Sequence, residues 1–150
     1  MTARIGVDAD SGLVHTVVGR AANVNDMTQA GALLHGDEMA AHGNAGCRGM
    51  HEREDAQGPH WHVAMQLGKR RQLTLTHRGA QLLKQAEQLK ASIRVKVEHP
   101  FHVIKNLFRH KKVRYRGLAK NTAQLFSLFG LANRVIAKRS LLDLHARGAS

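Results

Sequence analysis

A basic run with a single acid is the part of this chain whose residue types suggest chemistry. Between Arg94 and Lys120 there are nine lysines and arginines, and Glu98 is the only acidic residue. Mutual repulsion makes such a run costly to hold together unless an anion lies against it. In a helix, Arg94 and Glu98 face the same side one turn apart, and at 100° per residue Lys105 falls on the same flank. The simplest interpretation of Arg94 and Glu98 is an i,i+4 ion pair on a solvated helix.

A second position of interest follows a short apolar segment. Residues 39–43 predict a weak strand, and residues 44–49 (NAGCRG) predict a Gly-rich turn that leads into a helix. A strand that runs into such a turn is a common place to present a side chain at the carboxyl edge of a sheet. Asn44 holds that position. Asp8 is interpreted as an ordinary strand or turn carboxylate.

The elements that would carry these residues alternate between strands and helices. We expect a hairpin from strands 5–9 and 13–19 around the turn Asp10-Ser11-Gly12, a helix from Asn25 or Asp26 through Leu34, and a buried strand at 61–65. Residues 68–71 (GKRR) predict a basic loop, either a solvated turn or a contact with a DNA backbone. Further helices are predicted at 78–97 and 122–138, and the tail from Ser140 is expected to fray.

Two helical faces are predicted to point into a core. In the final helix, Leu125, Phe129 and Ala132 share one face. In the preceding helix, the predicted core stripe consists of Leu82, Ala86, Leu89, Ile93, Val97 and Ile104. Pro100 predicts either the first turn of a new helical segment or a kink after Glu98.

Composition limits the classes of protein. The chain has 150 residues, enough for one folded domain, and no linker long enough to divide it. Its 23 lysines and arginines against 11 acids give a net charge of +12, which favours nucleic acid as the partner. A single cysteine and the lack of a long apolar segment predict a cytoplasmic protein without an internal disulfide or a membrane anchor.

Several ordered motifs identify a family resemblance. Arg94, Glu98 and Lys105, separated by three and six residues, resemble the Tyr-Arg-Glu-Lys signature of the DDE transposases of bacterial insertion sequences. The segments IGVDADSGLVHTVVGRAANVND, WHVAM, KASIRVKVEHPFHVIKNLF and KVRYRGLAKNTAQL resemble the insertion sequence five group, and the likeness covers residues 5–137. Ala91 stands where the signature has its tyrosine.

The resemblance implies a fold and a reaction. DDE transposases cut DNA and join the freed 3′ ends to a target, using three carboxylates that hold two Mg²⁺ ions. Their fold is ribonuclease H-like, an α/β fold with a mixed sheet and flanking helices. The resemblance also assigns roles to residues of this chain. It implies that Glu98 is the third acid and a metal ligand and that Asn44 stands at the position of the second acid. It further implies that Arg94 and Lys105 contact phosphate. In the basic segment, the expected DNA contacts are Lys111, Lys112, Arg114 and Arg116.

The chain departs from the family pattern at two acids. Asn44 is a neutral ligand that cannot supply the anionic oxygen preferred by Mg²⁺. The family's first strand, which is central and carries the first acid, would precede Met1. We therefore expect a truncated catalytic domain, inactive by itself and associated with the bacterial nucleoid. The alternative is a small basic DNA-binding protein without catalysis that interferes with an intact transposase; neither interpretation involves a small-molecule substrate.

Overall fold

The computed structural model describes residues 1–21, 31–73 and 78–148, and the chain forms two compact units. The first unit comprises Met1–Val24 and Lys96–Ser150, and the second comprises Asn25–Val95. Strands in the described ranges form two separate two-stranded sheets, one antiparallel and one parallel. The structure thus mixes strands and helices as expected, with one of these sheets in each unit.

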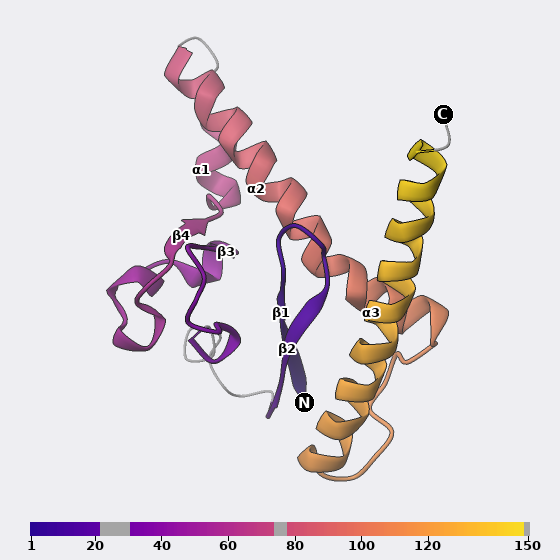
Figure 1. Cartoon of the computed structure of the whole chain (residues 1–150). Helices are drawn as coiled ribbons and strands as arrows, with labels where there is room; N and C mark the ends of the chain where they lie inside the picture. Colours follow the sequence, from indigo (N-terminus) through magenta and orange to yellow (C-terminus); the bar gives the residue numbers. More distant parts are fainter. Residues whose placement is uncertain (22–30, 74–77, 149–150) are drawn as a thin grey trace. The chain divides into compact units, whose positions relative to one another are not determined.

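The first unit begins with the predicted hairpin (Figure 1). Strand β1 (Thr2–Val7) pairs antiparallel with β2 (Val14–Arg20), and Ile5 lies opposite Val17. The first strand ends earlier than predicted because the turn already begins at Asp8. There the backbone N–H and the hydroxyl of Ser11 both donate to Asp8 Oδ1 at 2.6 Å. Asp8 is therefore a turn carboxylate, as predicted, and these hydrogen bonds from Ser11 lower its pKa.

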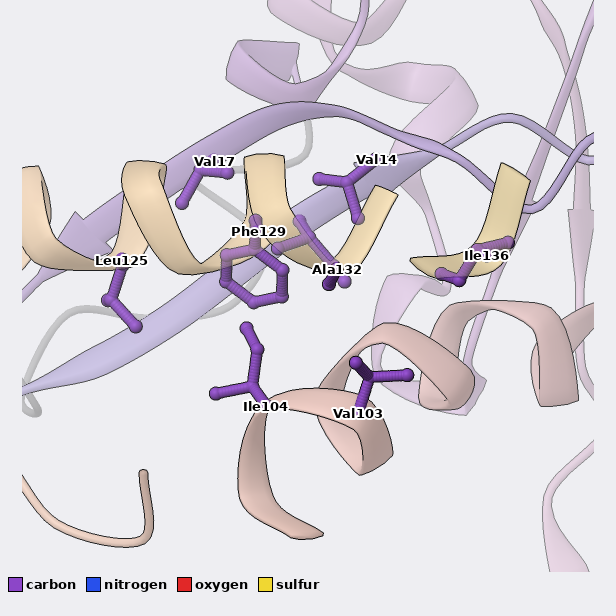
Figure 2. Packing of buried hydrophobic residues seen from close by; sticks show 9 residues of the cluster. Val14, Val17, Val103, Ile104, Leu125, Phe129, Ala132 and Ile136 are labelled. Carbon is purple, nitrogen blue, oxygen red and sulfur yellow. The ribbon is translucent and has the colours of Figure 1, made fainter. Parts of the chain in front are cut away.

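Helix α3 (Leu118–Gly148) packs against β2 and supplies more buried residues to the first core than any other described element. Its buried residues Leu125, Phe129, Ala132 and Ile136 recur at the spacing of a single helical face, which confirms the predicted core face. Figure 2 shows the Phe129 ring lying between Val17 of β2 and Ile104. Phe129 is only 1% exposed and forms the centre of this core.

The extent of α3 corrects the prediction of a shorter helix with a frayed tail. The helix begins four residues before Thr122 and continues through Ser140 to Gly148. Residues 140–147 (SLLDLHAR) contain good helix formers and neither proline nor glycine, so nothing in them stops the helix. Within the described residues the helix reaches Gly148, and it passes through Gly130 without a break.

The second unit is built on a small parallel sheet. Strand β3 (Ala40–Gly43) pairs with β4 (His60–Val63), so His42 lies opposite His62. The predicted weak strand is confirmed, and the second strand lies slightly earlier than predicted. Between them are short 3-10 helices at Ala45–Cys47, Met50–Glu52 and Glu54–Ala56. Met50 and Ala56 form a small core with Cys47 and Trp61.

Two predictions in the second unit need correction or fall partly outside the described residues. The basic loop at 68–71 belongs to a short helix, α1 (Leu67–Arg71), because lysine and arginine favour helix and Gly68 does not prevent a single turn. The start of the helix expected from Asn25 or Asp26 lies outside the described residues. At its expected end, Gly31–Leu33 forms a 3-10 helix.

Helix α2 (Arg78–His102) is longer than predicted and passes through Pro100 without ending. It is followed directly by a π-helical turn, Val103–Leu107. The predicted core stripe along α2 is wrong at its N-terminal end: Leu82 is 58% exposed and Leu89 is 67% exposed, whereas Ile104 is buried. Periodicity identifies an apolar face, but it does not reveal whether another element is large enough to cover that face.

Candidate functional site

Asn44 caps the 3-10 helix Ala45–Cys47 immediately after β3. Its side-chain oxygen accepts a hydrogen bond from the Gly46 N–H at 2.9 Å, and Cys47 Sγ lies 3.6 Å away as a weak donor. A Cβ on Gly46 would lie 3.0 Å from this oxygen, so glycine leaves room for the cap. The predicted strand and Gly-rich turn are confirmed here. Aspartate caps helices as well as asparagine does, so the fold does not require the amide.

A cavity of about 390 Å³ lies beside Asn44 within the second unit. Arg94, from the signature on α2, lines this cavity together with Arg70 of α1, Glu87 of α2 and Asn44. The structure therefore brings together Asn44 and Arg94, which are fifty positions apart in sequence. It adds Arg70 of the predicted basic loop and Glu87, and sequence analysis did not select Glu87.

Glu87 is only 5% exposed, and its hydrogen bond with Met65 ties α2 to the segment that follows β4. One carboxylate oxygen accepts the Met65 N–H at 2.9 Å, and the other accepts the Lys90 ammonium at 2.9 Å. Lys90 also donates to the Val63 carbonyl oxygen at 3.0 Å. Burial raises the pKa of Glu87, but the hydrogen bonds from Lys90 and Met65 outweigh it, so the pKa lies below its ordinary value.

Three histidines stack on the paired strands of the second unit. The rings of His42 and His62 lie 5.0 Å apart at an interplanar angle of 23°, and His60 stacks on His62 at 5.6 Å. Burial lowers the pKa of His42, and His62 and Lys90 act in the same direction. His42 Nδ1 is buried and has no hydrogen-bond partner within the described ranges.

The remaining signature residues lie on α2 and the π-helical turn. Glu98 is an exposed residue of the first unit and lies one turn after Arg94 on α2. Lys105 lies within the π-helical turn, where each turn takes more residues than in an α-helix. The spacing of 100° per residue that aligned Lys105 with Glu98 therefore does not apply across this turn. The Lys105 ammonium lies 5.9 Å from the centre of the Phe101 ring.

The residues around Asn44 do not fit a divalent metal ion. The Asn44 oxygen is committed to the Gly46 N–H, and the Glu87 carboxylate is engaged by Lys90 and Met65. Across residues 1–21, 31–73 and 78–148, no three histidine, cysteine or acidic side chains are grouped closely enough to hold a metal ion. A hard cation such as Mg²⁺ requires several oxygen ligands, preferably anionic ones.

The basic segment between the π-helical turn and α3 is exposed and held by one buried side chain. Lys111, Lys112, Arg114 and Arg116 are all exposed. Asn121, only 5% exposed, accepts the Tyr115 N–H at 3.1 Å and donates to the carbonyl oxygens of Tyr115 at 2.7 Å and Gly117 at 2.6 Å. Sequence analysis did not select Asn121, although an asparagine at the start of a helix is a known signal for local backbone hydrogen bonding.

One lysine of the basic run has an internal role. Lys96 donates to the carbonyl oxygens of Ala9 and Asp10, so its charge is held at the hairpin turn of the first unit. The nine basic residues of the run are therefore not equivalent as contacts for an anion.

Comparison with known families now identifies the class of protein. A family model described as the transposase DDE domain matches residues 1–134. The chain therefore belongs to the transposase DDE domain family, whose function is DNA transposition and whose members generally use a divalent metal ion. No solved structure matches the chain. No described helix is both long and apolar enough to cross a membrane.

Proposed function

We propose that this chain is a transposase domain of the insertion sequence five group that binds DNA but does not cut or join it by itself. The observation that supports binding is the exposed segment with Lys111, Lys112, Arg114 and Arg116, which carries no acid and is held on α3 by Asn121. Four neighbouring cations can neutralise several phosphates. Because their backbone is already ordered, binding does not cost the conformational entropy of ordering the segment. The DNA-bound chain would be associated with the bacterial nucleoid.

The proposed loss of catalysis rests on Asn44. In the ribonuclease H-like arrangement that we propose, Asn44 takes the place of the second acid and Glu98 that of the third. The amide of Asn44 cannot provide the anionic ligand, and its oxygen already serves as a helix cap. The cofactor expected from the family is Mg²⁺. The described residues provide no site that fits this ion, so we assign no catalytic step to it.

Binding is tested by mobility shifts with a duplex of arbitrary sequence at about 50 mM and about 200 mM salt. If four phosphates are neutralised, we expect the affinity to fall roughly 100-fold between these concentrations. Binding that does not change with salt would refute the electrostatic account.

The location of the DNA contact is tested with two matched triple variants. Replacing Lys111, Lys112 and Arg114 with glutamine should weaken binding more than the same replacement of Lys69, Arg70 and Arg71 of α1. Both variants lose three positive charges, so the comparison separates position from net charge. A larger loss from the α1 variant would reverse the ranking.

Catalysis is tested by strand transfer on a DNA end carrying the element's terminal repeat, with Mg²⁺ or Mn²⁺. We expect no product from the unmodified chain, because the described residues group no three metal ligands. We also expect none from Asn44→Asp alone, because the neighbouring Glu87 carboxylate is engaged by Lys90 and Met65. Metal-dependent product from the unmodified chain that disappears in Glu98→Gln would show that the acids have been assigned wrongly.

A second candidate function follows from a chain that carries the basic segment but has an asparagine at the proposed position of the second acid. A chain that occupies DNA without cutting it would interfere with an intact transposase acting on the same DNA. Added to a strand-transfer reaction of an intact family member, the unmodified chain should reduce product, and the variant lacking Lys111, Lys112 and Arg114 should not. Equal inhibition by both chains would exclude competition for DNA through this segment.

A further inference from the structure

A cavity of about 490 Å³ lies in the first unit, where the turn of the hairpin meets the last turns of α3. Neither the basic segment nor Asn44 lines it, so the proposed function does not use it. Its volume is within the range of sites that bind small molecules. Its apolar lining includes Leu13, Leu141 and Leu144, and the last two remain 57% and 64% exposed. This uncovered apolar surface favours a ligand with an aliphatic part.

Two carboxylates at this cavity lack a partner. The sequence of the first unit contains four acids, namely Asp8, Asp10, Glu98 and Asp143. Asp10 and Asp143 line the cavity, and neither carboxylate has a hydrogen bond or an ion pair within the described residues. Asp8, by contrast, accepts two hydrogen bonds from Ser11. Half of the acids of a basic unit are therefore gathered at one cavity without protein partners.

The cations nearby do not neutralise these carboxylates. Arg147 also lines the cavity and lies one helical turn after Asp143, but among the described residues the two form no ion pair. Lys96 donates to the carbonyl oxygens of Ala9 and Asp10, so its ammonium holds the backbone of the turn. With two carboxylates and one guanidinium, the lining carries more negative than positive charge and attracts a cation.

These features select a cation that carries an aliphatic chain. A bare metal ion would leave the leucines uncovered, and in the described ranges no three histidine, cysteine or acidic side chains are grouped to hold one. An aliphatic diamine carries an ammonium at each end at neutral pH, as the lysine side chain does. Its methylene groups can cover apolar surface. We infer that this cavity binds an aliphatic diamine, with the ammonium groups at Asp10 and Asp143 and the chain over Leu141 and Leu144.

The inference is tested by isothermal titration calorimetry of the full chain with two amines. Cadaverine and pentylamine have carbon chains of the same length, but pentylamine has only one ammonium group. Cadaverine should bind at one saturable site, and pentylamine should bind about fivefold more weakly because it forms one ion pair fewer. The chain has a net charge of +12 and repels cations, so saturable binding of a diamine requires a local site. Absence of saturable binding, or equal affinities for the two amines, would overturn the inference.

One pair of variants tests the carboxylates. Asp143→Asn and Asp37→Asn each remove one negative charge, but Asp37 is an exposed residue of the second unit and does not line the cavity. Asp143→Asn should weaken cadaverine binding about fivefold, and Asp37→Asn should leave it unchanged. Equal affinities of the two variants would contradict the proposed site.

A second pair tests the sign of the charge effect. Arg147→Gln and Arg139→Gln each remove one positive charge from α3, but only Arg147 lines the cavity. Arg147→Gln should strengthen cadaverine binding about threefold, because the guanidinium repels an ammonium, and the effect of Arg139→Gln should be smaller. Weaker binding in Arg147→Gln would show that the ligand does not enter as a cation.

A third pair tests the apolar lining. Leu141 and Leu142 are both 57% exposed, but only Leu141 lines the cavity. Leu141→Gln should weaken cadaverine binding about threefold, because the methylene chain loses part of its apolar contact, and Leu142→Gln should not. An equal effect of the two variants would remove the apolar lining from the site.

The outcomes are independent of the proposed function. The basic segment does not line this cavity, so Asp143→Asn should lose affinity for cadaverine while it keeps salt-dependent binding of DNA in mobility shifts. Failure to bind DNA would refute the proposed function alone. Failure of the unmodified chain to bind cadaverine would refute the diamine site alone.

Discussion

Asn121 and Tyr115 are joined by two hydrogen bonds of opposite direction. The Tyr115 N–H donates to Asn121 Oδ1 at 3.1 Å, and Asn121 Nδ2 donates to the Tyr115 carbonyl oxygen at 2.7 Å. A second bond from Nδ2 reaches the carbonyl oxygen of Gly117, whose φ of 91° bends the chain just before α3. One buried amide thereby sets the path of the exposed basic segment that precedes it.

Removing this amide should disorder the segment. We expect Asn121→Ala to lower the free energy of unfolding by about 1–3 kcal/mol, because buried backbone groups lose their partners. Its affinity for DNA should fall as well, although no charge changes. Thermal unfolding and mobility shifts measure the two effects. Asn106→Ala is the control, since Asn106 is an exposed amide whose side-chain nitrogen lies 3.0 Å from His102 Nδ1. Equal behaviour of the two variants would contradict this role of Asn121.

A second asparagine joins α3 to the hairpin. The Val14 N–H donates to Asn133 Oδ1 at 2.8 Å, and Asn133 Nδ2 donates to the Val14 carbonyl oxygen at 2.7 Å. Asn133→Leu keeps the shape but leaves both backbone groups without these partners, which should cost about 1–3 kcal/mol.

Gln124→Met is the matched control for Asn133→Leu in denaturant unfolding. Gln124 is also an amide on α3, but its buried Oε1 has no hydrogen-bond partner among the described residues. The control should therefore cost less than Asn133→Leu. A greater cost for Gln124→Met would show that the Asn133 bonds contribute little.

Close packing of α3 on β2 depends on Gly19. A Cβ added at this position would collide with Thr122 Oγ1 and would lie 2.8 Å from Met1 Cε. Gly19→Ala should therefore destabilise the chain by about 1–3 kcal/mol through overpacking. Thr122 Oγ1 is buried without a hydrogen-bond partner in the described part of the chain, so Thr122→Ala alone should cost little. The double variant should regain part of the lost stability in thermal unfolding, and strict additivity of the two changes would argue against the contact.

The lowered pKa of Glu87 predicts that the free energy of unfolding decreases in acid. Because its pKa in the folded chain lies below the ordinary value of 4.5, the unfolded chain takes up a proton first as the pH falls. The contribution of Glu87 is therefore complete above pH 4.5 and is lost as the pH falls through the pKa of the folded chain. Denaturant unfolding at several pH values should show this loss in the unmodified chain and a smaller one in Glu87→Gln. Lys90→Met should destabilise the chain at neutral pH, because it leaves a buried carboxylate with one hydrogen bond fewer.

The lowered pKa of His42 predicts a second loss of stability, at a higher pH than the loss due to Glu87. Its pKa in the folded chain lies below the ordinary value of 6.5, so the unfolded chain again binds the proton first. Stability should fall as the pH drops below 6.5, since a charged His42 would lie against His62 and near Lys90. His42→Leu should remove this part of the pH dependence. The exposed His51, which lies 3.6 Å from Glu52, provides the control His51→Leu, and it should leave the dependence in place.

Local patterns in the sequence determined several elements and the class of the protein. The hairpin around Asp10-Ser11-Gly12, the strand before Asn44 and the core face of Leu125, Phe129 and Ala132 all follow from signals that act over a few residues. The transposase family was recognisable from ordered motifs, and the family match over residues 1–134 supports it. Turn chemistry and helical periodicity are local properties, which explains why they can be predicted from one sequence.

Tertiary packing decided what local patterns left open. Leu82 and Leu89 have the spacing of a core stripe but remain exposed, whereas the charged Glu87 between them is buried because Lys90 and Met65 satisfy it. The continuation of α2 through Pro100 into a π-helical turn changed the placement of Lys105 relative to Glu98. The roles of Asn121 and Asn133 depend on backbone groups that folding brings to them, and in the case of Asn133 the partner, Val14, is 119 residues away. The fold determines which groups become hydrogen-bond partners of buried polar groups. These partners therefore cannot be predicted from local patterns in the sequence.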